Sequence, residues 1–329
     1  MIPAPDAAGT AEPTPDAELA PAPGWTAPLR HLVVNPLIVK DGLSRMRSWR
    51  APAAIAVYLS LLGLFAWLVL TLQSSSSPRF YGYAQTGSTV FTALALVQLA
   101  LVCLFTPGVA AGAISGERER QTLDVLLVSC ASSFSIVWGK LVASVAFIVV
   151  LILAALPLFA TVFLFGGIDA GQFLVIQLLT VTTAIATGAV SLFLSTLFRR
   201  TLAATVMSYA LTGAATAGTW VLGTILTQIA LVRTLARGPG PTGQTETYPL
   251  LYVNPIHAMT AVLQGGGAIP LGRATQLFFL VAGTPSTAGP RIEPWQATVL
   301  AQGGLVVVAV AATVALLRGR RVFVPRWGR

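Results

Sequence analysis

The most densely charged run between the apolar segments of the chain is Gly116-Glu117-Arg118-Glu119-Arg120, which Thr122 and Asp124 extend. The apolar residues that follow recur at the spacing of one helix face: Leu123, Leu126, Leu127, Cys130 and Phe134. This spacing predicts an amphipathic helix over about 114–135. Because long apolar segments flank it, we expect the helix to lie on a membrane surface with its charges in water. There it serves as a docking site for a partner or as a simple connecting loop.

Residues that enzymes use do not come together elsewhere in the sequence. The pair Gly139-Lys140 is followed by Leu141 and lacks the upstream glycine of a phosphate-binding loop. The two histidines, His31 and His257, are predicted on opposite sides of a membrane, and the two cysteines have no metal or disulfide spacing. We therefore expect no catalytic residue, no metal site and no cofactor in this chain.

The composition is typical of integral membrane proteins. Hydrophobic residues make up 55% of the chain and charged residues 9%, whereas soluble proteins carry about 25% charged residues. The net charge of +9 would suit nucleic acid only if the basic residues formed one folded face. They lie instead at the ends of apolar segments. We therefore expect no nucleic-acid partner and an all-α, polytopic fold in contact with membrane lipid.

Six apolar segments are each long enough to cross a hydrocarbon core of about 30 Å, at a rise of about 1.5 Å per residue. They cover about 51–72, 89–113, 141–165, 172–198, 201–231 and 297–317. The fifth is longer than one crossing needs, so we expect it to tilt, to bend near Gly213 or Gly218, or to protrude. Pro107 and Pro157 are expected to kink the second and third spans.

The basic residues predict the orientation of these spans. If the first span begins in the cytoplasm, 15 of the 20 lysines and arginines lie on the cytoplasmic side and the other five lie outside. Such an excess is typical of the cytoplasmic side of a membrane protein. We therefore expect a multi-pass protein of the plasma (inner) membrane, with both termini and the helix at 114–135 in the cytoplasm.

Two segments precede the spans. Residues 1–29 are rich in proline and alanine, which predicts a disordered cytoplasmic tail. Residues 30–50 begin a helix at Asn35-Pro36 and then carry four basic side chains, namely Lys40, Arg45, Arg47 and Arg50. This pattern predicts an amphipathic interfacial helix, which either connects to the first span or only anchors the topology.

A long outer segment covers residues 232–294. Within it, Asn254-Pro255 is expected to start a short apolar helix, and residues 277–281 are apolar but too short to span. These pieces either re-enter the membrane or lie on its outer surface. The sequence leaves both arrangements open.

The predicted spans contain no Asp, Glu, Lys, Arg or His. Ion-coupled transporters usually carry ionisable residues within the membrane, because such residues form the ion path. Their absence from the predicted spans argues against a transporter that is driven by an ion gradient.

The central motif resembles that of a known family, the permease subunits of ABC transporters of the type 2, exporter-class membrane-domain family. The matching residues are the run from Glu117 to Leu127, with its acidic-basic pairs and Thr122-Leu123-Asp124, and then Gly139-Lys140-Leu141 at the opening of the third span. The segment after Asn35-Pro36 is similar to the connecting helix of these permeases. Gln121 stands where the family usually has glycine, and Ser129-Cys130 where Thr-Pro is common. The layout covers residues 30–329, with residues 51–329 as the six-helix permease domain.

The resemblance implies a mechanism. The helix at 114–135 would be a coupling helix that docks on a separate ATP-binding subunit, with Arg118 and Arg120 in contact with carboxylates of that partner. ATP and Mg²⁺ would be bound by the partner, and two permease copies or paralogues would pair. A membrane scaffold that anchors a soluble partner without moving a substrate would share the same docking helix. The substrate is not readable from the sequence.

Overall fold

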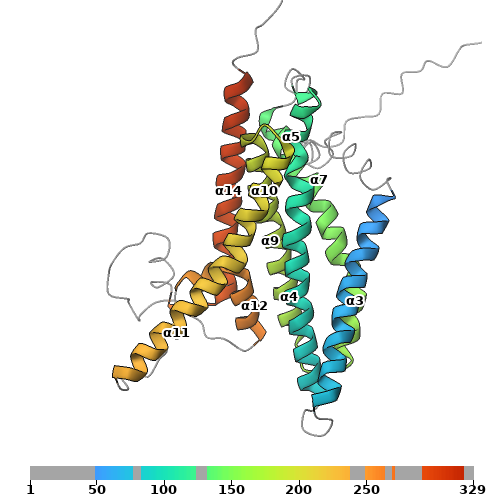
Figure 1. The fold of residues 1–329 in the computed structure, drawn as a ribbon, viewed down its shortest axis with the longest axis vertical. Coiled ribbons are helices and arrows are strands. Elements are labelled where there is room, and N and C mark those ends of the chain that lie inside the picture. The colour runs from blue at the N-terminus through green and yellow to red at the C-terminus, as the bar shows by residue number, and fades with distance from the viewer. Residues whose placement is uncertain are drawn as a thin grey trace, which may run out of the picture.

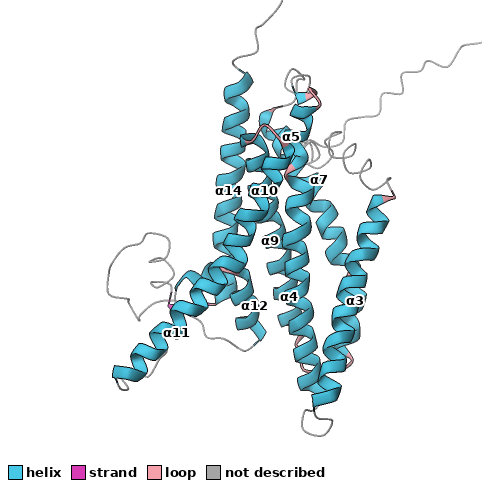
Figure 2. Ribbon diagram, viewed as in Figure 1, coloured by secondary structure: helices cyan, strands magenta, loops and turns pink. Residues whose placement is uncertain are grey.

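A computed structural model of the chain describes residues 49–76, 83–123, 132–237, 249–263, 269–270 and 291–321. Nearly all of this part is helical, as Figure 2 shows. The described residues also form one antiparallel pair of two-residue strands, β1 (Ile269–Pro270) and β2 (Arg291–Ile292). The predicted tail at 1–29, nearly all of the interfacial helix at 30–50, and the apolar stretch at 277–281 lie outside the described residues.

Six helices are long and apolar enough to cross a membrane, which confirms the predicted all-α, polytopic fold. They cover Ala51–Gln73, Thr86–Glu119, Ser133–Phe163, Ala170–Leu197, Thr201–Ile229 and Pro294–Gly319. The second and third are longer than the sequence predicts, because they continue into the charged segment from both sides. The charged residues at 117–119 therefore belong to the end of the second span, and Lys140 lies two turns inside the third.

The spans form an elongated bundle, seen from the side in Figure 1. The elements before its centre are α3 (Arg50–Ser76), α4 (Tyr83–Ala110), α5 (Gly112–Glu119), α7 (Ser133–Ala154) and α8 (Leu156–Phe163). The central helix is α9 (Ala170–Leu197), which contacts α4, α5 and α7 as well as the later helices α10, α12 and α14. Half of the residues in its most apolar window are buried. The helix α9 therefore lies at the centre of the described bundle.

Two prolines coincide with breaks in the long helices. The second span is divided at Ala111, one turn after Pro107, and the third is divided at Ala155, just before Pro157 in the first turn of α8. A proline removes one backbone donor and its ring crowds the preceding turn, so a helix bends or restarts there. At the α8 end, the rings of Phe91, Phe159, Phe163 and Phe173 pack together, with the closest centroids 5.4 Å apart.

The fifth span changes its winding in the middle. Its elements are α10 (Thr201–Gly213), a π-helical turn (Ala214–Gly218) and α11 (Thr219–Arg237). The π turn begins directly after Gly213 and ends at Gly218, the two positions at which the sequence suggests a bend. In Figure 1, α11 leaves the bundle at an angle to α10.

The last elements pack between this bent span and α14 (Pro294–Arg321). A 3₁₀ turn covers Pro249–Val253, and α12 (Pro255–Leu263) begins directly after Asn254. The side chain of Asn254 is 1% exposed. Its Oδ1 accepts from the amide of Ile256 at 2.8 Å, and its Nδ2 donates to the carbonyl of Thr216 in the π turn at 2.6 Å. One asparagine thus caps α12 and holds it against the π turn.

Candidate functional site

The helix predicted over 114–135 is interrupted, which corrects the sequence-based interpretation. Residues up to Glu119 complete the second span, and residues from Ser133 onward begin the third, with Ser132 as the N-cap of α7. Residues 124–131, which include Asp124, Leu126 and Leu127, lie outside the described residues. Leu123, the last described residue before them, is buried against the bundle.

The interruption follows from the backbone at Gln121, whose φ of 58° lies in the left-handed region. The amide of Gln121 donates to the carbonyl of Arg118 at 3.1 Å, and that of Thr122 donates to the carbonyl of Glu117 at 2.9 Å. These two bonds form the Schellman motif that ends many helices, in which glycine is the usual left-handed residue. The position where the sequence departs from the family's glycine is therefore the position at which the helix must end.

Glu117 connects the second span to the third. Its Oε1 lies 2.6 Å from Nζ of Lys140, and the side chains are 26% and 6% exposed respectively. A lysine so deeply buried requires a partner, because an isolated charge out of water is strongly destabilising. In the sequence the two residues belong to separate features, the charged run and the start of the third span, and the structure brings them together.

Arg118 connects the second span to the fourth. Its Nη1 donates to the carbonyl of Phe198 at 2.9 Å and its Nη2 to the carbonyl of Thr196 at 3.1 Å. Both carbonyls stand at the end of α9, where backbone acceptors have no partner within the helix and where positive charge is favourable. This guanidinium is therefore engaged within the chain, and its contact with a partner protein stays a prediction.

Glu119 connects the second span to the fifth. Its carboxylate accepts from the backbone amide of Thr201 at 2.8 Å and from the Thr201 hydroxyl at 2.9 Å. Arg200, the N-cap residue of α10, gives no side-chain cap. Glu119 supplies the missing acceptor from another helix, at an end where negative charge is favoured. Gly116 faces the same contact, since a Cβ built there would lie 3.6 Å from Cγ2 of Thr201.

A fourth connection lies one turn deeper. The hydroxyl oxygen of Ser195, in α9, accepts from the amides of Ile114 at 3.0 Å and Ser115 at 2.9 Å. These amides belong to the first turn of α5, whose own N-cap residue, Ala111, offers no side-chain acceptor. Ser195 and Ser115 are fully buried. One serine in an apolar span gives no signal of this role in the sequence, and sequence reasoning missed Ser195.

We call this set of contacts the helix-end junction, defined by Glu117, Arg118, Glu119, Lys140 and Ser195 with their partners. It lies at the upper end of the bundle in Figure 1, where α5 and α9 end and α7 and α10 begin. Arg120 and Thr122, which follow the junction, are exposed. Gly139 is buried next to Lys140. Arg50 is the first residue of α3, whereas Asn35, Pro36, Lys40, Arg45 and Arg47 lie outside the described residues.

A separate cavity of about 250 Å³ lies within the bundle, between α9, α10 with its π turn, α12 and α14. Gln302 of α14 reaches it and donates from Nε2 to the hydroxyl of Thr183 at 2.9 Å, while its Oε1 has no partner among the described residues. The other lining residues are small, apolar or hydroxyl-bearing, and Thr187 and Thr216 are among them. The cavity thus offers hydrogen-bond acceptors and no charge.

Chemically, the described residues carry no group of three or more His, Cys, Asp or Glu side chains that would hold a metal ion. The charged residues of the junction are engaged with helix ends and with one another. The arrangement can act mechanically. It joins the end of the second span to the third span two turns from its start, and to the adjoining ends of the fourth and fifth spans, beside an exposed turn.

The comparison with known proteins agrees with this architecture. Residues 67–319 match the family model described as an ABC-2 family transporter protein. No curated relative matches the chain. The matched region begins within the first span and ends near the end of the sixth, so it includes the whole helix-end junction and the cavity. The chain belongs to the ABC-2 family of transporter proteins.

Proposed function

We propose that this chain, a multi-pass permease component of an ABC transporter, couples ATP hydrolysis by a separate ATP-binding subunit to export across the plasma membrane. The partner would dock on the exposed turn at Arg120 and Thr122 and on the segment that follows. ATP and Mg²⁺ would be held by that partner, and a second permease copy or a paralogue would complete the transporter.

The helix-end junction is the observation that carries this proposal. A force applied at Arg120 acts on the end of the second span. From there Glu117 passes it to α7 through Lys140, Arg118 passes it to the end of α9, and Glu119 passes it to the start of α10. Each of these contacts involves a charged side chain at a helix terminus, where such bonds are stronger than neutral ones. Movement of the docking turn would therefore move four spans together.

The distribution of basic residues indicates the side of the membrane on which the docking surface lies. The described basic residues near this end include Arg118, Arg120, Lys140, Arg199 and Arg200. An excess of arginine and lysine is typical of the cytoplasmic side, which is where ATP is available. This supports a cytoplasmic junction, and export is the direction that the type 2 resemblance implies.

The experiment uses the full chain co-expressed with each ATP-binding cassette ATPase of its source organism. We expect one of these to co-purify as a stable complex whose ATP hydrolysis in lipid nanodiscs depends on this chain. Arg120→Glu should lower retention of the ATPase by about tenfold or more, because like charges that meet at an interface cost several kcal/mol. Arg199→Glu, a charge reversal at another exposed arginine near this end of the bundle, is the matched control and should retain the partner.

Two results separate the alternatives. Retention of the ATPase by Arg120→Glu at the control level would show that the turn is not the docking surface. A complex that forms and hydrolyses ATP, but in which the nucleotide changes nothing in the spans, would favour the membrane scaffold.

A further inference from the structure

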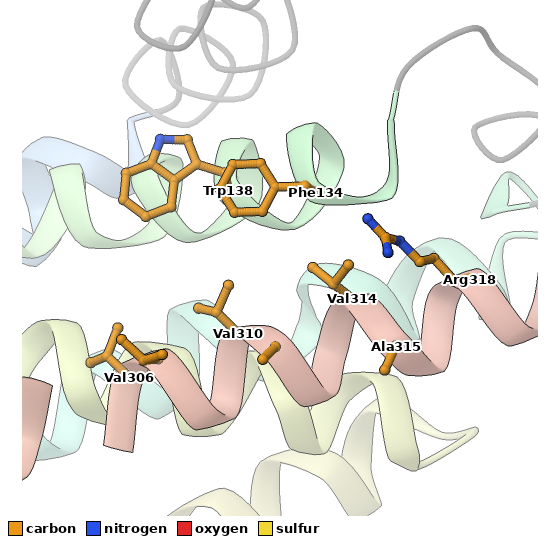
Figure 3. A pocket seen from close by; sticks show the side chains of 9 residues that line it. Phe134, Trp138, Val306, Val310, Val314, Ala315 and Arg318 are labelled. Atoms are coloured by element: carbon orange, nitrogen blue, oxygen red, sulfur yellow. The ribbon is translucent and has the colours of Figure 1, made fainter. Parts of the chain in front are cut away.

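A second hollow, which we call the lateral groove, lies on the outside of the bundle between the start of α7 and the last turns of α14. Its volume is about 520 Å³. Phe134 and Trp138 form one wall, with their rings stacked at a centroid distance of 6.0 Å. The opposite wall is a row of small apolar side chains on α14: Val306, Val310, Val314 and Ala315. Figure 3 shows the two aromatic rings above this row.

The groove is open to the surroundings of the bundle. Phe134 is 41% exposed, Trp138 is 36% exposed and Val307 is 69% exposed. In a multi-pass membrane protein, apolar side chains on the outside of the spans face lipid chains. Apart from the indole N–H of Trp138, the lining offers one polar side chain, so neither water nor a polar substrate would be held along most of its length.

That polar side chain is Arg318, at the end of the groove. Its guanidinium lies beyond Val314, on the side of Phe134, in Figure 3. No ion pair or hydrogen bond to Arg318 is found among residues 49–76, 83–123, 132–237, 249–263 and 291–321. It stands in the last turns of α14, at the same end of the bundle as the helix-end junction. An apolar groove that ends in an arginine at the level of the helix termini is complementary to a phospholipid: the groove matches an acyl chain and the arginine matches the phosphate.

We propose that the lateral groove binds an anionic phospholipid from the leaflet on the side of the junction. One acyl chain lies between the aromatic wall and the valine row, and the phosphate is bound by Arg318. Guanidinium and phosphate form paired, charge-assisted hydrogen bonds, and basic residues at this level of a membrane favour anionic over neutral headgroups. Trp138 is two residues from Lys140, so the lipid would also set the position of α7 beside the junction.

The chain provides its own probe, because Trp138 lines the groove. The full-length protein is reconstituted in phosphatidylcholine vesicles that contain an equal fraction of either brominated phosphatidylglycerol or brominated phosphatidylcholine. Bromine quenches tryptophan fluorescence at contact, and the contribution of Trp138 among the seven tryptophans is obtained by comparison with Trp138→Phe. We expect the Trp138 signal to report about a fivefold preference for phosphatidylglycerol, because one arginine or lysine near an anionic headgroup contributes about 1 kcal/mol. Added salt should reduce this preference.

Three variants identify the headgroup contact. Arg318→Gln should abolish the preference while quenching by both lipids continues, and Arg318→Lys should restore most of it. Arg199→Gln, at the same end of the bundle but outside the groove, should leave it unchanged. Equal quenching by the two lipids in the wild type would overturn the proposal, as would a preference that survives Arg318→Gln. Absence of quenching by either lipid would also overturn it, and would show that protein covers the groove, either a second copy or residues 30–48 of this chain.

Discussion

Nζ of Lys140 and Oε1 of Glu117 lie 2.6 Å apart and join the third span to the end of the second. Glu117 belongs to the charged run, and Lys140 follows it 23 positions later in sequence. Arg118 and Glu119, the next two residues, reach the ends of α9 and α10. Three consecutive charged side chains therefore bind three different helices, and this makes the end of the second span a shared anchor.

The first prediction concerns this ion pair. Lys140→Met leaves the carboxylate of Glu117 beside an apolar side chain, and removal of one partner from a buried pair costs about 3–5 kcal/mol. Because Glu117 is 26% exposed, we expect a loss near the lower end of that range, measured as thermal unfolding of the purified chain in detergent. Lys140→Met combined with Glu117→Gln should recover much of the loss. A double variant as unstable as the single one would show that the pair does not hold the helices together.

The second prediction concerns Ser195. Ser195→Ala removes the acceptor of two buried amides in α5, and each buried unsatisfied donor costs about 1–3 kcal/mol. We expect a clear fall in thermal stability and faster amide exchange at Ile114 and Ser115. Ser191 provides the control, because its hydroxyl is equally buried one turn away and has no hydrogen-bond partner among the described residues. Ser191→Ala should be close to neutral, and similar losses in the two variants would contradict the capping role.

The third prediction concerns Gln121. A left-handed backbone costs a residue with a Cβ roughly 1–2 kcal/mol more than it costs glycine. Gln121→Gly should therefore stabilise the chain by up to about 1 kcal/mol, whereas Gln121→Val should destabilise it, because a β-branched side chain tolerates this backbone least. Thermal unfolding of both variants checks the sign. If Gln121→Gly lowered stability and Gln121→Val raised it, the Schellman ending would be wrong.

The fold class and the six spans could be predicted from the sequence, because length and hydropathy alone determine whether a helix can cross a membrane. The end of the second span could not. The helical spacing continues past Gln121 through Leu123, Leu126 and Leu127. The spacing of apolar residues does not reveal that the backbone of a single residue is left-handed. The family's glycine at this position was the one signal of a helix end.

The roles of the charged residues depend on contacts between distant parts of the chain. Glu119 and Thr201 are 82 positions apart, and Arg118 and Phe198 are 80 apart. A run of alternating charges has the same composition whether it is solvated or bound to helix termini, so sequence spacing predicts the solvated face by default. The same limit applies to Asn254, whose place before Pro255 predicts a helix cap but not its second contact.

The fourth prediction separates the two roles of Asn254. Asn254→Ala should increase amide exchange both in the first turn of α12 and in the π turn at Ala214–Gly218. Asn254→Ser retains an oxygen that can accept from Ile256 but cannot reach the carbonyl of Thr216. We expect serine to restore protection in α12 and not in the π turn. Equal recovery of both regions would show that the asparagine acts only as a helix cap.

The most direct measurement for the coupling role is amide exchange in the complex with its ATP-binding subunit, in lipid nanodiscs, with and without ATP and vanadate. The helix-end junction predicts that nucleotide changes exchange together at residues 112–123, 133–141, 192–198 and 201–205. In the variant that combines Glu117→Gln with Lys140→Met, residues 133–141 should no longer respond while 112–123 still do. A nucleotide response confined to residues 112–123 in the wild type would contradict the proposal that this junction transmits movement to the spans.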